Sequence, residues 1–134
     1  MRGLIKVRGN SDAYTDGYLS KLTHELSNGQ KVFMAHGHKH DRYDVESNYY
    51  LLQDAQKVGA KFAFYGHTHF ADVVQVDGVV IVNPGSTYEP RASWSGHQKG
   101  IPSYAVLTIT NQDCNVQILA VADNSVIIDE NFVF

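Results

Sequence analysis

Two short segments of the chain hold five of its seven histidines. Residues 35–40 read AHGHKH and residues 65–69 read YGHTH, and each segment follows an apolar run. The histidines concerned are His36, His38, His40, His67 and His69. Neutral imidazoles bind borderline divalent metals, and residues two apart in an extended backbone point to the same side. The spacing therefore predicts a metal site, whereas a lone histidine such as His24 or His97 is more often solvated.

A helix and a buried strand are predicted to position these histidines. Apolar residues recur at helical spacing from residue 45 to 58, Asp44 can cap the start, and Gly59 stands where helices commonly end. The next run, residues 61–65, is nearly all apolar, which is typical of a strand covered on both faces. A helix that leads into such a strand indicates an α/β layer.

Turn residues predict hairpins on both sides of this unit. Strands at 22–26 and 31–35 flank Asn28 and Gly29, which can supply the positive φ angles of a tight turn. Strands at 71–76 and 79–82 flank Asp77 and Gly78 in the same way. Further strands are predicted at 4–7, 103–110, 115–121 and 125–128. The predicted fold class is α/β with α+β character, in which most strands are antiparallel.

Length and composition restrict the class of protein. A chain of 134 residues suffices for one hydrophobic core, so we expect a single domain over residues 1–134. The net charge of -3 and the scattered 11 lysines and arginines argue against a nucleic-acid surface. The only cysteine, Cys114, excludes an internal disulfide, and no apolar run reaches the roughly 20 residues of a membrane span. We therefore expect a cytoplasmic protein that does not bind membranes.

Four motifs in a fixed order resemble those of a known family. They are VRGNSD at residues 7–12, AHGH at 35–38, YGHTH at 65–69 and NPGS at 83–86. In this order they resemble the later motifs of the calcineurin-like metallophosphoesterases, in the small bacterial and archaeal phosphodiesterase branch that also includes the retromer scaffold subunit. The resemblance spans nearly the whole chain, and it implies a metallophosphoesterase-type β-sandwich flanked by helices.

The resemblance implies a set of metal ligands. Asn10, His36 and His67 match the positions that hold one metal of a two-metal centre, and His69 matches a ligand of the other metal. The implied reaction is phosphodiester hydrolysis by a metal-bridging hydroxide, with the cations offsetting charge on the phosphate. Nitrogen and oxygen ligands suit Mn²⁺, with Zn²⁺, Fe and Ni²⁺ as alternatives.

Two further residues are predicted to face the substrate, a small-molecule phosphate ester. His38 lies two residues after His36 and can face a bound phosphate as a catalytic group, with a plain hydrogen-bonding role as the alternative. Arg91 lies in the loop from residue 87 to 100 and can meet a phosphate oxygen with its fork of donors. A surface arginine is the commoner outcome for such a residue.

The first two motifs of the family do not occur in this sequence. Asp-x-His and Gly-Asp give the family its carboxylate ligands, including the one that bridges both metals, and neither is found in the 134 residues. We expect an N-terminally truncated domain that binds one metal, as a fragment or a misplaced start of a phosphodiesterase would. The alternative is a degenerate form that serves as a protein-interaction scaffold. Missing strands would also uncover a sheet and favour a homo-oligomer.

Two unrelated classes agree less well with the sequence. Residues 36–41 read HGHKHD and superficially resemble the His-x-His-x-Asp-His site of metallo-β-lactamase-type hydrolases, but the last two residues stand in the wrong order. A β-rich interaction domain with incidental histidines would bind neither Mn²⁺ nor Zn²⁺. A metal titration therefore separates that class from a metallophosphoesterase.

Overall fold

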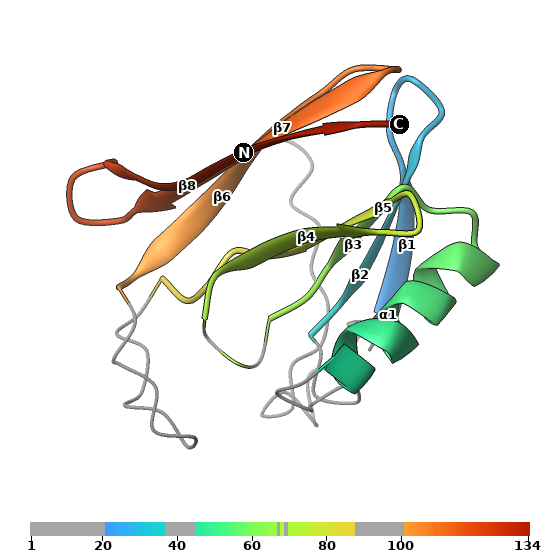
Figure 1. The fold of residues 1–134 in the computed structure, drawn as a ribbon, viewed down its shortest axis with the longest axis horizontal. Coiled ribbons are helices and arrows are strands. Elements are labelled where there is room, and N and C mark those ends of the chain that lie inside the picture. Colours follow the sequence, from blue (N-terminus) through green and yellow to red (C-terminus); the bar gives the residue numbers. More distant parts are fainter. Residues whose placement is uncertain (1–20, 37–44, 67, 69, 88–100) are drawn as a thin grey trace.

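The computed structural model describes residues 21–36, 45–66, 68, 70–87 and 101–134 (Figure 1). The elements in these ranges are β1 (Lys21–Glu25), β2 (Lys31–Ala35), α1 (Val45–Lys57), β3 (Phe62–Phe64), β4 (Asp72–Val76), β5 (Val79–Asn83), β6 (Ser103–Ile109), β7 (Asp113–Ala120) and β8 (Val126–Val133). The strand predicted at residues 4–7 and the cap predicted at Asp44 lie outside the described residues.

Five strands form one mixed sheet in the order β1-β2-β3-β5-β4. β1 pairs antiparallel with β2, and β4 pairs antiparallel with β5. The three central strands, β2, β3 and β5, run parallel to one another. Helix α1 lies between β2 and β3 in the chain, as the crossover that parallel neighbours require. The carboxyl ends of the three central strands therefore lie at the same end of the sheet.

The two faces of this sheet bury different layers, because successive residues of a strand point to opposite sides. The residues that pack with α1 are Phe33, Ala35, Ala63, Val79 and Ile81, together with Leu51, Leu52 and Ala55 of the helix. Those that pack with the second sheet are Val32, Phe62, Val80 and Val82, together with Cys114, Val116 and Ile118. Three layers result, with the five-stranded sheet between the helix and the second sheet (Figure 1). The predicted α/β class is confirmed.

Helix α1 ends at a glycine, as predicted. Gly59 has a φ of 72°, and its N–H donates to the Gln56 carbonyl at 3.1 Å. The N–H of Ala60 donates to the Ala55 carbonyl at 2.9 Å, which completes a Schellman motif. The helix has 13 residues. No helix among the described residues is long and apolar enough to cross a membrane.

Both predicted hairpins form, but their turns differ. Asp77 and Gly78 have φ angles of 48° and 79°, as a type I′ turn requires. Between β1 and β2 only Gly29 has a positive φ, 86°, so the prediction of a positive φ at Asn28 is wrong. Asn28 instead accepts a hydrogen bond at Oδ1 from the Gln30 N–H at 3.0 Å. Its side chain, rather than its backbone angle, stabilises this turn.

The second sheet is antiparallel, in the order β6-β7-β8. β8 continues to Val133, past the predicted end at residue 128. Cross-strand amides support the extra length: Asn115 Nδ2 donates to Asp129 Oδ1 at 2.8 Å and to Asn131 Oδ1 at 3.0 Å. Polar residues near the end of the chain are thus paired across strands instead of forming a tail.

Candidate metal site

The carboxyl ends of β2 and β3 bring the two histidine segments together. His36 follows β2 directly, and its carbonyl accepts a hydrogen bond from the Gly66 N–H at 2.8 Å. The N–H of Tyr65 donates to the Val82 carbonyl on β5 at 3.0 Å. The parallel pairing therefore continues beyond β3 to Tyr65 and Gly66, the first residues of the second histidine segment.

Gly66 lies directly against His36. A Cβ placed on Gly66 would meet the His36 carbonyl oxygen at 3.5 Å and Nδ1 of the same residue at 4.0 Å. Both distances are ordinary van der Waals contacts, so space alone does not require glycine here. They nevertheless place the partly buried imidazole of His36 beside the backbone of the second histidine segment.

Asn83, the last residue of β5, ties the second histidine segment to the sheet. Its exposed fraction is 0%. Nδ2 donates to the Gly66 carbonyl at 3.2 Å and to Thr68 Oγ1 at 2.9 Å. Oδ1 accepts from the Gly85 N–H at 3.0 Å. Gly66 and Thr68 are the two neighbours of His67 in the chain, so one buried amide binds the residue before it and the residue after it.

Thr68 extends this restraint toward β4. Its hydroxyl oxygen also accepts a hydrogen bond from the Phe70 N–H at 3.3 Å. The N–H of Thr68 donates to the Gly66 carbonyl at 2.7 Å. These local hydrogen bonds restrict the conformation of the described residues between β3 and β4. A metal-binding loop needs a restricted conformation to hold its ligands in place.

The turn after β5 is fitted closely against the second sheet. Gly85 has a φ of 85°, and a Cβ there would overlap the hydroxyl oxygen of Ser103. That hydroxyl donates to the Pro84 carbonyl at 2.8 Å, and the Ser103 N–H donates to the Ser86 carbonyl at 2.8 Å. The first residue of β6 therefore anchors the turn next to Asn83 and connects the site to the second sheet.

Tyr65 adds no negative charge to this region. Its burial, followed by the charge of Asp72, raises the pKa of Tyr65 to about 12, while a hydrogen bond with Asn83 acts in the opposite direction. The phenol is therefore protonated throughout the physiological pH range.

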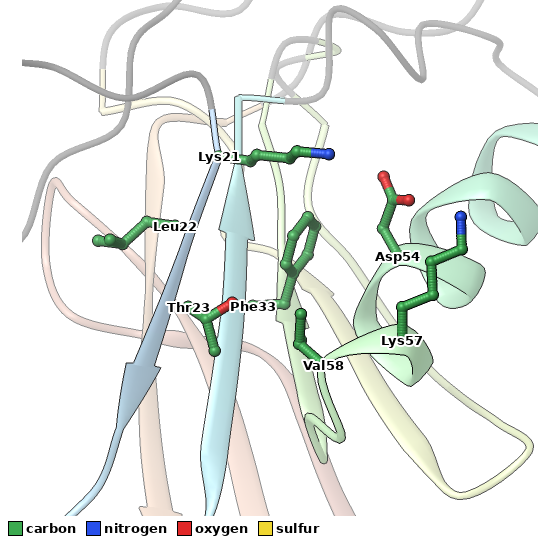
Figure 2. A pocket seen from close by; sticks show the side chains of 7 residues that line it. All are labelled: Lys21, Leu22, Thr23, Phe33, Asp54, Lys57 and Val58. Carbon is green, nitrogen blue, oxygen red and sulfur yellow. The ribbon is translucent and has the colours of Figure 1, made fainter.

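A shallow hollow of about 160 Å³ lies apart from this site, between β1, β2 and α1 (Figure 2). Phe33 lies in it, and Lys21, Asp54 and Lys57 line its polar part. His36, the predicted site residue that the structure describes, does not line the hollow. Helix α1 packs over the central strands β2, β3 and β5 beside this hollow.

The structure describes one of the predicted site residues, His36. Asn10, His38, His67, His69 and Arg91 lie outside the described residues. In the described part of the chain, no three His, Cys, Asp or Glu side chains come together as a metal-binding group. Of the predicted ligands, this part therefore shows the position of His36 alone, beside Gly66.

The residues that build the frame are not evident from the sequence. Sequence analysis includes residues 83–86 and 65–69 among the motifs but gives no individual role to Asn83, Thr68 or Ser103. One signal is present: Asn83 follows four apolar residues of a buried strand. A polar amide in that position needs buried hydrogen-bond partners, and the nearest strand ends supply them.

Comparison with known proteins identifies the family. Residues 1–112 match the calcineurin-like phosphoesterase superfamily domain. Over 120 residues the chain is 30% identical to the "Probable metallophosphoesterase YsnB" of Bacillus subtilis (strain 168), a match that covers 90% of this chain and 65% of that protein. The chain thus spans slightly less than two thirds of the length of this relative.

Solved structures share the fold. A predicted phosphoesterase from Streptococcus pneumoniae superposes with a TM-score of 0.76 at 28% identity, covering 96% of this chain and 69% of the other. A single mutant of Vps29 from Entamoeba histolytica gives a TM-score of 0.72 at 25% identity, covering 96% and 67%. The predicted metallophosphoesterase-type fold is confirmed, and the chain belongs to the calcineurin-like phosphoesterase superfamily.

Proposed function

We propose that this chain provides the histidine ligands of a two-metal phosphoesterase centre, and that the complete centre hydrolyses small-molecule phosphodiesters. The observation that carries the proposal is the 2.8 Å hydrogen bond from the Gly66 N–H to the His36 carbonyl. It joins the ends of the two strands that lead into the histidine segments. Membership of the phosphoesterase superfamily supports the same chemistry.

In the proposed centre, Asn10, His36 and His67 hold one cation and His69 is a ligand of the other. Two bound cations supply a nucleophilic hydroxide at neutral pH and offset the charge of the phosphate. Mn²⁺ is the proposed metal, with Zn²⁺, Fe or Ni²⁺ as substitutes, because the donors are nitrogen and oxygen. Cys114 adds no thiolate to this set, since burial, followed by the charge of Asp113, raises its pKa to about 11.

The protein's own groups orient the ligands and the substrate. Asn83 donates to the Gly66 carbonyl and to the Thr68 hydroxyl, so it holds the two chain neighbours of His67 in place before a metal binds. His38 contacts the phosphate group, and Arg91 donates to its oxygens through the guanidinium fork. The substrate is thereby held through its phosphate group.

A protein-interaction scaffold on the same fold is the second candidate function. The likeness to Vps29, at 25% identity and a TM-score of 0.72, favours it, because the retromer scaffold belongs to the branch that the motifs resemble. The histidines separate the two candidates. A scaffold has no chemical need for His36, His67 and His69 together, whereas a phosphoesterase centre depends on them.

Hydrolysis of bis(p-nitrophenyl) phosphate with Mn²⁺ tests the proposal. The 134 residues contain neither Asp-x-His nor Gly-Asp, so the comparison is with a chimaera preceded by a family N-terminal segment that contains both motifs. We expect at least about 100-fold more activity in the chimaera, because charge-stabilising groups each contribute on that scale. His36→Ala should abolish that activity, and His24→Ala, an exposed residue of β1, should preserve it.

Each remaining outcome of this assay has a defined meaning. Equal activity in the two proteins would contradict the requirement for the added carboxylates. A folded chimaera that binds Mn²⁺ without hydrolysing the ester would favour the scaffold. A chimaera that binds no metal would overturn the proposed centre itself.

A further inference from the structure

The turn between β1 and β2 places an asparagine directly before a glycine. Asn28 and Gly29 are both exposed, and Gly29 has a φ of 86°. The backbone nitrogen of a residue and the side-chain carbonyl carbon of an asparagine before it can close a small ring, a succinimide. Glycine has no side chain that obstructs the approach of its own nitrogen. Asn28 therefore stands in a position where a reaction with the chain that follows it is sterically open.

This reaction is a cyclisation that releases ammonia. The Gly29 nitrogen loses its proton and attacks Cγ of Asn28, the bond from Cγ to Nδ2 breaks, and the nitrogen leaves as NH₃. Water, the one co-reactant, then opens the ring. Opening at the side-chain carbonyl gives aspartate. Opening at the backbone carbonyl gives isoaspartate, in which the chain continues through the side chain.

Gln30 holds both ends of the Asn28 amide. Its N–H donates to Asn28 Oδ1 at 3.0 Å, and its Oε1 accepts from Asn28 Nδ2 at 2.7 Å. Oδ1 is the atom that gains negative charge when Cγ is attacked. A donor already aimed at such an oxygen lowers the barrier of the reaction. The folded turn therefore supplies a stabilising hydrogen bond for the intermediate.

One contact of the turn opposes the reaction. The Gly29 N–H donates to the Leu26 carbonyl at 2.9 Å, and this bond must open before the nitrogen attacks. It lies in an exposed turn, where local opening requires little free energy. The Leu26 N–H, which donates to the Gln30 carbonyl at 2.7 Å, takes no part in the attack. The restraint thus slows the cyclisation without preventing it.

The other asparagines with described side chains lack this combination. Asn83 precedes Pro84, which has no N–H to lose. Asn124 precedes Ser125, whose N–H donates to Asp123 Oδ1 at 3.0 Å. The remaining ones precede larger side chains, which shield the nitrogen beside them, and these asparagines are Asn111, Asn115 and Asn131.

We propose that Asn28 is a modification site, at which the chain deamidates spontaneously through a succinimide to an isoaspartyl form with a weakened β1–β2 hairpin. Isoaspartate adds one atom to the backbone path between Asn28 and Gly29. Turn geometry sets the register of a hairpin, and the pairing that starts at Glu25 and Lys31 depends on this turn. The aspartyl product keeps the normal backbone and an oxygen that accepts from the Gln30 N–H.

Peptide mapping by mass spectrometry after incubation at mildly alkaline pH tests the site. In the native chain, Asn28 should change from amide to acid, and the rate should rise with pH because the attacking nitrogen must lose its proton. The rate should exceed that at Asn124 by at least about five-fold, which one neutral hydrogen bond to the reacting oxygen is worth. An isoaspartyl methyltransferase with S-adenosylmethionine should label the same peptide.

Asn28→Gln is the control for the chemistry, because glutamine cannot close the same ring. It should show neither the change at residue 28 nor the methyl label there. A native chain in which Asn28 stays an amide, or changes no faster than Asn124, would overturn the proposal.

Thermal unfolding tests the effect on the hairpin. The deamidated chain carries one negative charge more than the native chain, whose formal net charge is -3, so anion exchange isolates it for mapping. Asn28→Asp is the matched control, because it has the same charge on a normal backbone. The isoaspartyl form should unfold at least about 3 °C below Asn28→Asp. Equal unfolding temperatures would mean that the hairpin tolerates the extra atom, which would contradict the proposed weakening.

Discussion

Asn83 Nδ2 donates a hydrogen bond to Thr68 Oγ1 at 2.9 Å, which joins the end of β5 to the loop that follows β3. The two residues are 15 positions apart in the chain, and Asn83 is fully buried. Buried amides with several partners impose one geometry, because each unmade hydrogen bond is costly in a medium of low polarity. The bond therefore holds Thr68 to the buried end of β5.

Replacing the amide should destabilise the fold. Asn83→Ala leaves Gly85 N–H without its partner and removes both bonds to the loop, so we expect a loss of roughly 2–4 kcal/mol in the free energy of unfolding. Asn28→Ala is the matched control, because Asn28 also makes side-chain hydrogen bonds but in an exposed turn. Its cost should stay below about 1 kcal/mol. Urea unfolding measures both, and equal losses would contradict a special role for Asn83.

The hydroxyl of Thr68 can be removed at constant shape. Thr68→Val keeps the branched side chain but deletes the oxygen that accepts from Asn83 and from Phe70 N–H, at an expected cost of roughly 1–3 kcal/mol. Thr68→Ser keeps the oxygen and should recover most of that loss. If the valine and serine variants were equally stable in urea, the hydroxyl would have no structural part in the loop.

Two glycines with similar backbone angles should differ sharply in their tolerance of a side chain. Gly85 and Gly78 have φ angles of 85° and 79°, so alanine is strained at both. A Cβ at Gly78 meets nothing within 4 Å, whereas one at Gly85 overlaps Ser103 Oγ. We expect Gly78→Ala to cost about 1 kcal/mol and Gly85→Ala distinctly more. Similar midpoints in urea would show that the fit against Ser103 is unimportant.

Stability should fall on the alkaline side because of Cys114. Burial, followed by the charge of Asp113, raises its pKa from 9.0 to about 11. Between these values the unfolded chain releases the proton and the folded chain keeps it, so rising pH favours unfolding. Cys114→Ala should flatten this decline by roughly 2 kcal/mol. Urea unfolding at pH 7, 9 and 11 under reducing conditions measures it, and an unchanged slope in the variant would contradict the assignment.

The elements of the fold were largely predictable because their signals are local. The Asp77–Gly78 turn needs positive φ angles that those residues adopt readily, and Gly59 ends α1 through bonds to residues within one turn. Asn28 was misjudged because a polar side chain can stabilise a turn by hydrogen bonding as well as by its backbone angle. β8 was predicted too short because its polar residues are paired with Asn115, which lies on another strand.

The frame of the candidate site depends on distant contacts, which the sequence does not encode locally. Asn83 bonds to Gly66 and Thr68 across two strands, and Ser103 holds the turn after β5 from the second sheet. Residue types at these positions suit many surface turns equally well. The histidine site stays a prediction, because of its histidines the described residues include His36 alone.

A titration with Mn²⁺ followed by isothermal calorimetry tests the central claim most directly, namely that His36 is a metal ligand beside the second histidine segment. The native chain should bind the metal, and His36→Ala should weaken binding by at least about 100-fold, since even residues that only support a ligand contribute 10- to 100-fold. His24→Ala, an exposed histidine on β1, should bind as the native chain does. A His36→Ala variant with native affinity, or a native chain without any Mn²⁺ or Zn²⁺ binding, would contradict the account.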